Sequence, residues 1–306
     1  MDSENAEYHF PEHALAQIAA LWTWSVDIPV DCDMLYHYYK GHTLKKVAKK
    51  KKLLFRLAAA ETFPDKMEGK AVEVYYDLAL ESLLKEKRIT ENQFFRLSSI
   101  DIPQNMEFMF RDSGSFHYSK GVEYEEYIIC FSKAQDDLYM YETYTGDSDG
   151  YCLHLFSEEI EEIRNLGIDN HAVIKLIPVL YGSEATAYIK RKIVDILSDP
   201  VKAEDMDYYI NSILHYVHYA AKRNKFAREK EVRLVVFLPK NCAEPLPNIK
   251  FETSKTNQKY IYLSVPSDML FDVTYAPYNA KEEVQEMREY LENIGYSRML
   301  DEEGLY

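Results

Sequence analysis

The spacing of hydrophobic positions changes near residue 93. Before that point the apolar residues recur at helical intervals. Residues 11–26 are rich in Ala, Leu and Ile, and a second helix is predicted over 67–87. The positions of this second helix that match the i, i+3, i+4, i+7 spacing of one buried face are Ala71, Val74, Tyr75 and Leu78. The first part of the chain is therefore predicted to be mainly helical.

After residue 93 the chain consists of short runs rich in β-branched and aromatic residues, separated by polar turns. The predicted strands are 94–98, 127–131, 151–156, 173–181, 231–238, 260–265 and 271–275. Two amphipathic helices interrupt them, at 204–222 and at 280–294. We expect the last helix to start at Asn279, with Glu282 three residues on, and to end at Gly295.

This layout predicts an α+β protein with a mixed, largely antiparallel sheet core, flanking helices and a helical N-terminal region. We divide the chain into a helical N-terminal region, residues 1–92, and an α+β core domain, residues 93–306. The strand-like segment 35–40 lies within the first region, and we expect it to be able to join the core sheet.

Composition narrows the function classes. The chain has 306 residues and a formal net charge of -15, so nonspecific DNA binding is not expected. Its ten glycines form neither G-x-G-x-x-G nor a P-loop, which argues against a glycine cradle for a dinucleotide or triphosphate. Four scattered cysteines, an acidic start without an apolar stretch and no apolar run of about 18 residues predict a cytoplasmic protein without a membrane span.

One segment departs from the acidic balance. Residues 45–52 hold six lysines in eight positions. A solvated helix face explains such a run, and so does a patch that contacts phosphates or a protein partner. The sequence leaves both interpretations open, and the oligomeric state is not predicted.

The pattern with the clearest chemical meaning is Glu229-x-Glu231-x-Arg233. If the strand reaches back to residue 229, these three side chains share one face and Val232 belongs to the core face. One interpretation is structural: Arg233 pairs with Glu231 or with a carboxylate on the next strand. The other is functional: a glutamate stabilises positive charge on a ribose-like carbon or acts as a general base, and Arg233 orients it or holds a phosphate.

Two further pairs are weaker candidates. His215 and His218 stand one helical turn apart but have no Glu-x-x-His partner, which favours a structural pair over a zinc site. Cys130 with His154 suggests a thiol nucleophile, yet no third partner is evident. No metal site is predicted.

Several blocks of the chain resemble the bacterial family catalogued as domain of unknown function 2971. The blocks, in order, are 35–40, Leu97-Ser98-Ser99, Asn105 with Glu107-Phe108, 130–132, 141–144, 150–153, 179–181, Glu229-x-Glu231-x-Arg233 and 273–277. The block order is similar to that of mono-ADP-ribosyltransferases, which bind NAD without a glycine loop. Members of the family often lie beside antiviral or toxin loci, which implies a defence role.

The resemblance implies a site. Glu231, supported by Glu229 and Arg233, is expected to be catalytic. The substrate-binding residues it implies are His37, Tyr38, Lys40, Ser98, Ser99 and Tyr144. We therefore predict a nucleotide-handling effector that transfers ADP-ribose from NAD or cleaves NAD. A non-catalytic binding or sensor module is the alternative, and a metal-dependent nuclease is the third.

Overall fold

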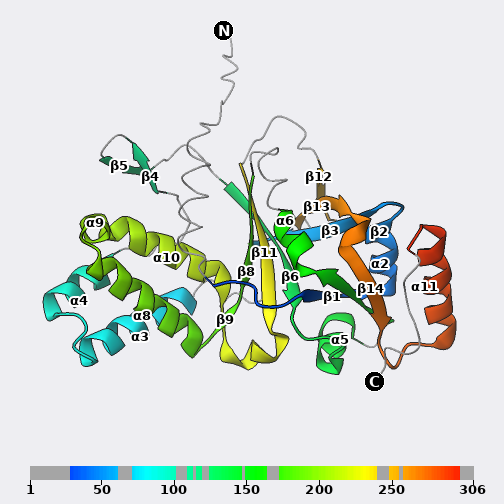
Figure 1. The fold of residues 1–306 in the computed structure, drawn as a ribbon, viewed down its shortest axis with the longest axis horizontal. Helices are drawn as coiled ribbons and strands as arrows, with labels where there is room; N and C mark the ends of the chain where they lie inside the picture. The colour runs from blue at the N-terminus through cyan, green and yellow to red at the C-terminus, as the bar shows by residue number, and fades with distance from the viewer. Residues whose placement is uncertain are drawn as a thin grey trace, which may run out of the picture.

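A computed structural model describes residues 28–60, 71–100, 109–112, 115–118, 124–146, 149–163, 172–239, 248–254 and 258–296. Within these residues the centre of the protein is a curled, mostly antiparallel sheet of ten strands (Figure 1). The strands of this sheet are β1 (Met34–Lys40), β2 (Ala48–Lys49), β3 (Lys52–Ala59), β6 (Tyr124–Ser132), β7 (Gly150–Phe156), β8 (Val173–Pro178), β11 (Glu231–Pro239), β12 (Ile249–Thr253), β13 (Lys259–Pro266) and β14 (Leu270–Tyr275).

The sheet branches at β6. One edge of β6 pairs with β11 along its length, and β11 pairs in turn with β8. The other edge of β6 pairs with β3 near Ile128 and with β1 at Ser132. β3 continues into β13 and β12, and β1 continues into β7 and β14. Because the two arms diverge, the sheet encloses apolar side chains from both arms, including Leu35, Phe55 and Phe131.

Helices cover the sheet on two sides (Figure 1). One group packs on the face that β6, β8 and β11 turn away from the enclosed core. It comprises α3 (Ala71–Lys85), α4 (Glu91–Ser98), α8 (Ser183–Ser198), α9 (Pro200–Glu204) and α10 (Met206–Ala220). On the opposite side lie α2 (Gly41–Val47) and α11 (Lys281–Asn293). The short helices α5 (Leu138–Thr145) and α6 (Ser157–Glu162) flank β7 in the chain.

Two small pairs of strands complete the described structure: β4 (Met109–Asp112) with β5 (Ser115–Tyr118), and β9 (Leu180–Tyr181) with β10 (Ala221–Lys222). None of the helices in the described ranges combines the length and the apolar character that a membrane crossing requires.

The α+β class and the largely antiparallel sheet are confirmed, and the segment 35–40 does join the sheet, as β1. The predicted strand at 94–98 is wrong. That segment is helix α4, which starts with a capping box in which Thr90 and Gln93 bond each other's backbone N–H. The expectation of helix before residue 93 is also wrong at β3, a strand with alternating burial. The predicted helix 11–26 lies outside the described residues.

The buried face of α3 also differs from the prediction. Val74 and Leu78 are exposed, whereas Val72, Tyr76 and Leu80 are buried, so the helix is turned relative to the expected face. The last helix begins one residue later than predicted, with Ala280 as its N-cap and Glu283 in the capping position, and Gly295 follows its end in a left-handed conformation.

Candidate functional site

Glu231 occupies a fixed place at the start of β11. It lies opposite Ser132 of β6, its carbonyl accepts from the Val179 N–H at 2.9 Å, and its own N–H donates to the Tyr181 hydroxyl at 2.7 Å. The pairing with β6 and these two hydrogen bonds hold the residue, so the direction of its side chain is set by the sheet.

The carboxylate of Glu231 is fully engaged by cations. Its Oε1 accepts from Arg233 Nε at 2.6 Å, and its Oε2 accepts from Lys222 Nζ at 2.6 Å. Lys222 Nζ also donates to Glu229 Oε2 at 2.7 Å, and Arg233 donates to the Tyr219 carbonyl at 2.7 Å. The four side chains form one group, called here the ion cluster: Lys222, Glu229, Glu231 and Arg233.

Glu229 belongs to the ion cluster although it does not lie on the strand of Glu231. The strand starts at Glu231, and Glu229 ends a 3-10 helix over Asn224–Glu229. Lys230 between them adopts a left-handed conformation with φ of 44°, which reverses the chain locally. Ser132 Oγ donates to the Glu229 carbonyl at 2.6 Å and fixes this turn. The expectation that residue 229 lies on the strand is therefore corrected, although both carboxylates do converge.

The ion cluster is buried and electrically balanced. Glu229, Glu231 and Arg233 are each at most 3% exposed. Burial by itself raises the pKa of Glu231, but Arg233 and Lys222 outweigh burial and bring it down to about 2. Two carboxyl groups thus face one lysine and one arginine, and the formal charges of the ion cluster sum to zero. The structural interpretation of the motif, in which Arg233 pairs with Glu231, agrees with this geometry, and the catalytic role of Glu231 stays a prediction.

Tyr144 connects the ion cluster with the surface. Its hydroxyl donates to Glu229 Oε2 at 3.0 Å, while the residue as a whole is 41% exposed. Burial of the hydroxyl end, together with Glu231 and Glu229, raises the pKa of Tyr144 above its usual range. Of the predicted substrate-binding residues, Tyr144 is thus the one that the described structure shows in contact with a predicted catalytic glutamate, Glu229.

The other predicted substrate-binding residues are placed elsewhere. His37 lies on the opposite face of the sheet from Glu231, against Phe131 of the enclosed core, and its Nδ1 is 2.6 Å from the Cys130 carbonyl. Tyr38 shares the face of Glu231 but donates to the Ala134 carbonyl at 2.6 Å. The predicted place of His37 in one site with Glu231 is therefore corrected: Tyr36 and Tyr38 share the face of Glu231, and His37 between them points to the other face.

Lys40, Ser98 and Ser99 do not join the ion cluster in the described structure. Lys40 is exposed at the end of β1. Ser98 ends α4 and Ser99 caps it, with Ser99 Oγ donating to the Arg96 carbonyl at 2.7 Å. The expected serine-bearing strand is therefore corrected to a helix end, and this helix packs on α3 (Figure 1).

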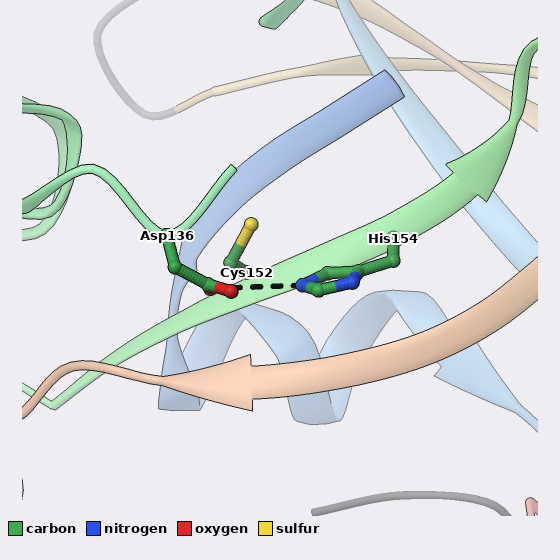
Figure 2. Close-up of side chains that lie close together, drawn as sticks. All are labelled: Asp136, Cys152 and His154. Carbon is green, nitrogen blue, oxygen red and sulfur yellow. Dashed lines mark ion pairs between the residues drawn. The ribbon is translucent and has the colours of Figure 1, made fainter. Parts of the chain in front are cut away.

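A second group of chemistry-bearing side chains lies on the same face of the sheet. Cys152 and His154 alternate on β7, and Asp136 comes from the loop between β6 and α5 (Figure 2). One ligand atom from each lies within 4.8 Å of the others, and His154 Nε2 is 3.6 Å from Asp136 Oδ1. His154 lies opposite Tyr36, Tyr36 opposite Ser132, and Ser132 opposite Glu231. The group and the ion cluster therefore lie on the same face of the adjacent strands β7, β1, β6 and β11.

Two hydroxyl groups complete the surroundings of this group. Thr274 Oγ1 lies 3.0 Å from His154 Nε2 and also donates to Asp136 Oδ1. Tyr141 Oη donates to the same Asp136 oxygen at 3.0 Å. Burial and the nearby Asp136 raise the pKa of the Cys152 thiol, so the thiol is protonated at neutral pH. A thiol, an imidazole and a carboxylate that converge in this way can hold a metal ion.

Sequence reasoning missed this group, although one signal was present. The spacing Cys152-x-His154 in a predicted strand places both side chains on one face. The weaker candidate pair, Cys130 with His154, takes its cysteine from β6, where Cys130 lies opposite Arg233. In the described residues no other group of His, Cys, Asp and Glu shows such convergence. His215 is buried beside Tyr219 and Phe237, as expected for a structural histidine.

Comparison of the chain with protein-family models, with curated proteins and with solved structures gives no match. The resemblance described above therefore rests on the sequence blocks alone and stays a prediction, as do the activity and the defence role that it implies.

Proposed function

We propose that the protein is a binding module that docks a short acidic segment of a protein partner on the lysine-rich segment 45–52, called here the lysine turn. The carrying observation is the exposure of Lys46, Lys50, Lys51 and Lys52, which have no ion-pair partner among the described residues. The contacts of both Glu231 oxygens with cations agree with a structural role for that residue.

The lysine turn is not the single helix face that a solvated run predicts. It starts in the last turn of α2, passes through β2 and a two-residue turn, and enters β3. Lys51 adopts a left-handed conformation with φ of 64°, which costs a non-glycine residue about 1 kcal/mol. Lys50 and Lys51 therefore lie at the tip of a tight turn between the paired strands β2 and β3.

The hydroxyl groups of two tyrosines contact backbone carbonyls of the lysine turn. Tyr290 Oη lies 2.7 Å from the Lys45 carbonyl and 2.9 Å from the Ala48 carbonyl. Tyr296 Oη lies 3.1 Å from the Lys52 carbonyl. Because the backbone of the turn is already fixed, anion binding has to order the lysine side chains and not the backbone.

The surrounding charge favours a short anionic partner over a long one. The chain carries a net charge of -15, and α11, which contacts α2, holds five glutamates. A nucleic acid that extended beyond the turn would meet this acidic surface within a Debye length of about 8 Å. A short acidic peptide segment can bind the lysines and end before it reaches α11.

Binding of a fluorescein-labelled oligo-glutamate peptide, followed by anisotropy, tests this proposal. We expect the Lys50→Glu/Lys51→Glu variant to weaken binding at least tenfold, since two attractive charges become repulsive. The matched control is Lys85→Glu/Lys87→Glu, which makes the same charge change at exposed lysines and also includes a left-handed one, Lys87. Equal binding by both variants, or tighter binding of a short oligonucleotide than of the peptide, contradicts the proposal.

The second candidate is the NAD-handling activity that the resemblance implies. Its supporting observation is the contact of the partly exposed Tyr144 with Glu229, beside the ionised Glu231. If this activity is present, incubation with NAD releases nicotinamide, and Tyr144→Phe and Glu231→Gln each lower the rate at least about 100-fold. The exposed Glu159→Gln serves as the control. An absence of nicotinamide release, in a wild-type protein shown to be folded, contradicts this candidate.

A further inference from the structure

We infer that Asp136, Cys152 and His154 form a binding site for one zinc ion, with Thr274 and Tyr141 as supporting hydroxyl groups. This site is separate from the lysine turn and does not depend on the proposed function. Its evidence is the convergence of three different ligand types from the loop after β6 and from β7 (Figure 2).

The observed spacing matches the geometry of tetrahedral zinc. With Zn–N of about 2.05 Å, Zn–O of about 2.1 Å and a tetrahedral angle, the two ligand atoms stand about 3.4 Å apart. The observed distance between His154 Nε2 and Asp136 Oδ1 is 3.6 Å. The same reasoning requires the Cys152 sulfur about 3.6 Å from the histidine nitrogen. The ligand atoms already lie within 4.8 Å of one another, so shifts of about 1 Å close the site.

The ligand set indicates the metal. Mg²⁺ and Ca²⁺ take oxygen ligands, whereas a thiolate together with an imidazole selects zinc or a similar transition ion. Binding would displace the thiol proton of Cys152 to solvent, so that the sulfur bonds the metal as a thiolate and one proton is released. His154 would bind through Nε2, which requires the tautomer that carries its proton on Nδ1.

The geometry disfavours a catalytic thiol relay in the same group. A relay places the cysteine and the carboxylate at the two different nitrogens of the histidine ring. Here one atom of each residue converges on a common centre, and His154 Nε2 itself faces Asp136. Convergence of one atom per residue is the arrangement of metal ligands.

The surroundings fit a zinc site with an exchangeable fourth ligand. Three protein ligands leave one tetrahedral position for water or another small ligand. Thr274 Oγ1 and Tyr141 Oη, which both contact Asp136 Oδ1, can orient that carboxylate and hydrogen-bond to the fourth ligand. Cys152 and His154 are buried, whereas the Asp136 side chain is 23% exposed, so the ion would enter past Asp136.

Metal titration of the full chain tests the inference. We expect one equivalent of Zn²⁺ in calorimetry, with release of about one proton seen as a dependence of the heat on buffer. Substitution by Co²⁺ is expected to give a thiolate-to-cobalt charge-transfer band and intense visible bands of a four-coordinate site. Thr274→Val, which keeps all three ligands, is expected to weaken zinc binding about 10-fold to 100-fold.

Ligand variants make the test specific. Cys152→Ser is expected to abolish the charge-transfer band and to weaken binding more than 100-fold, whereas Cys32→Ser, which changes another thiol, is expected to leave both unchanged. Because Cys152 is buried, Asp136→Asn provides a variant at a partly exposed position, and near-ultraviolet circular dichroism checks the fold of each variant. Failure of the folded wild type to bind Zn²⁺ at micromolar concentration overturns the inference. So does binding that survives both Cys152→Ser and Asp136→Asn.

Discussion

Replacing Lys222 with Met is expected to lower the free energy of unfolding by about 3–5 kcal/mol. Lys222 Nζ contacts Glu229 and Glu231 at 2.7 and 2.6 Å, and both glutamates are 3% exposed. The substitution keeps the length of the side chain but leaves two buried carboxylates with Arg233 as the one remaining cation of the ion cluster. The cost arises mainly from an uncompensated buried charge. Urea unfolding of the wild type and the variant measures it.

A double variant separates charge balance from packing. Lys222→Met/Glu229→Gln removes one positive and one negative charge, and the ion cluster is again neutral. We expect it to regain at least half of the stability lost in Lys222→Met. The double variant would then be more stable than the sum of the two single changes predicts. Lys225→Met, at an exposed position of the neighbouring 3-10 helix, is the control and should change stability by less than about 0.5 kcal/mol. Equal losses in Lys222→Met and Lys225→Met would falsify the assignment of a buried, balanced cluster.

The sheet could be predicted where local patterns are strong. The strand at β11 has consecutive β-branched residues and is buried on both faces, and β6, β7, β13 and β14 have similar runs. The predictions of elements and faces fail where two local patterns compete. Phe94 and Phe95 give segment 94–98 the composition of a strand, but the capping box at Thr90 and Gln93 decides for a helix. In α3, two faces satisfy the helical spacing, and packing against α8 and α10 selects the one without Val74.

The site depends more strongly on information that the sequence does not contain. Glu229 and Glu231 could be predicted to converge, but the reason is the left-handed Lys230 rather than strand alternation. The position of His37 away from Glu231 could not be predicted, because the face that a strand residue occupies depends on strand order and register, which no local pattern fixes. Asp136 meets Cys152 and His154 through a contact between the loop after β6 and strand β7, which no local pattern fixes.

Acidification from pH 8 to pH 5 is expected to lower the free energy of unfolding by about 4 kcal/mol through two histidines. Burial, with a contribution from His218, lowers the pKa of His215 to about 3. Burial lowers the pKa of His37 to about 4, against the opposing effect of its bond to the Cys130 carbonyl. Both histidines stay neutral in the folded protein at pH 5, whereas the unfolded chain protonates them below a pKa of about 6.5.

The sign follows from proton binding. Between pH 6.5 and the folded pKa values of about 4 and about 3, the unfolded state binds more protons, so stability falls as the pH falls. Each histidine contributes about 2 kcal/mol at pH 5 relative to pH 8. Glu231 acts in a different window. Its folded pKa of about 2 lies below the ordinary value of 4.5, so its stabilising effect is complete above pH 4.5 and is lost toward pH 2.

Urea unfolding at several pH values, on variants that cannot titrate, measures these contributions. His215→Leu keeps the buried site apolar, and His37→Asn retains a donor for the Cys130 carbonyl. Each is expected to reduce the fall in stability between pH 8 and pH 5 by about 2 kcal/mol, whatever its effect at pH 8. His42→Asn, at an exposed position, is expected to leave the fall unchanged. A pH profile of His215→Leu/His37→Asn as steep as that of the wild type contradicts the neutral state of both rings in the folded protein and means that other groups cause the acid sensitivity.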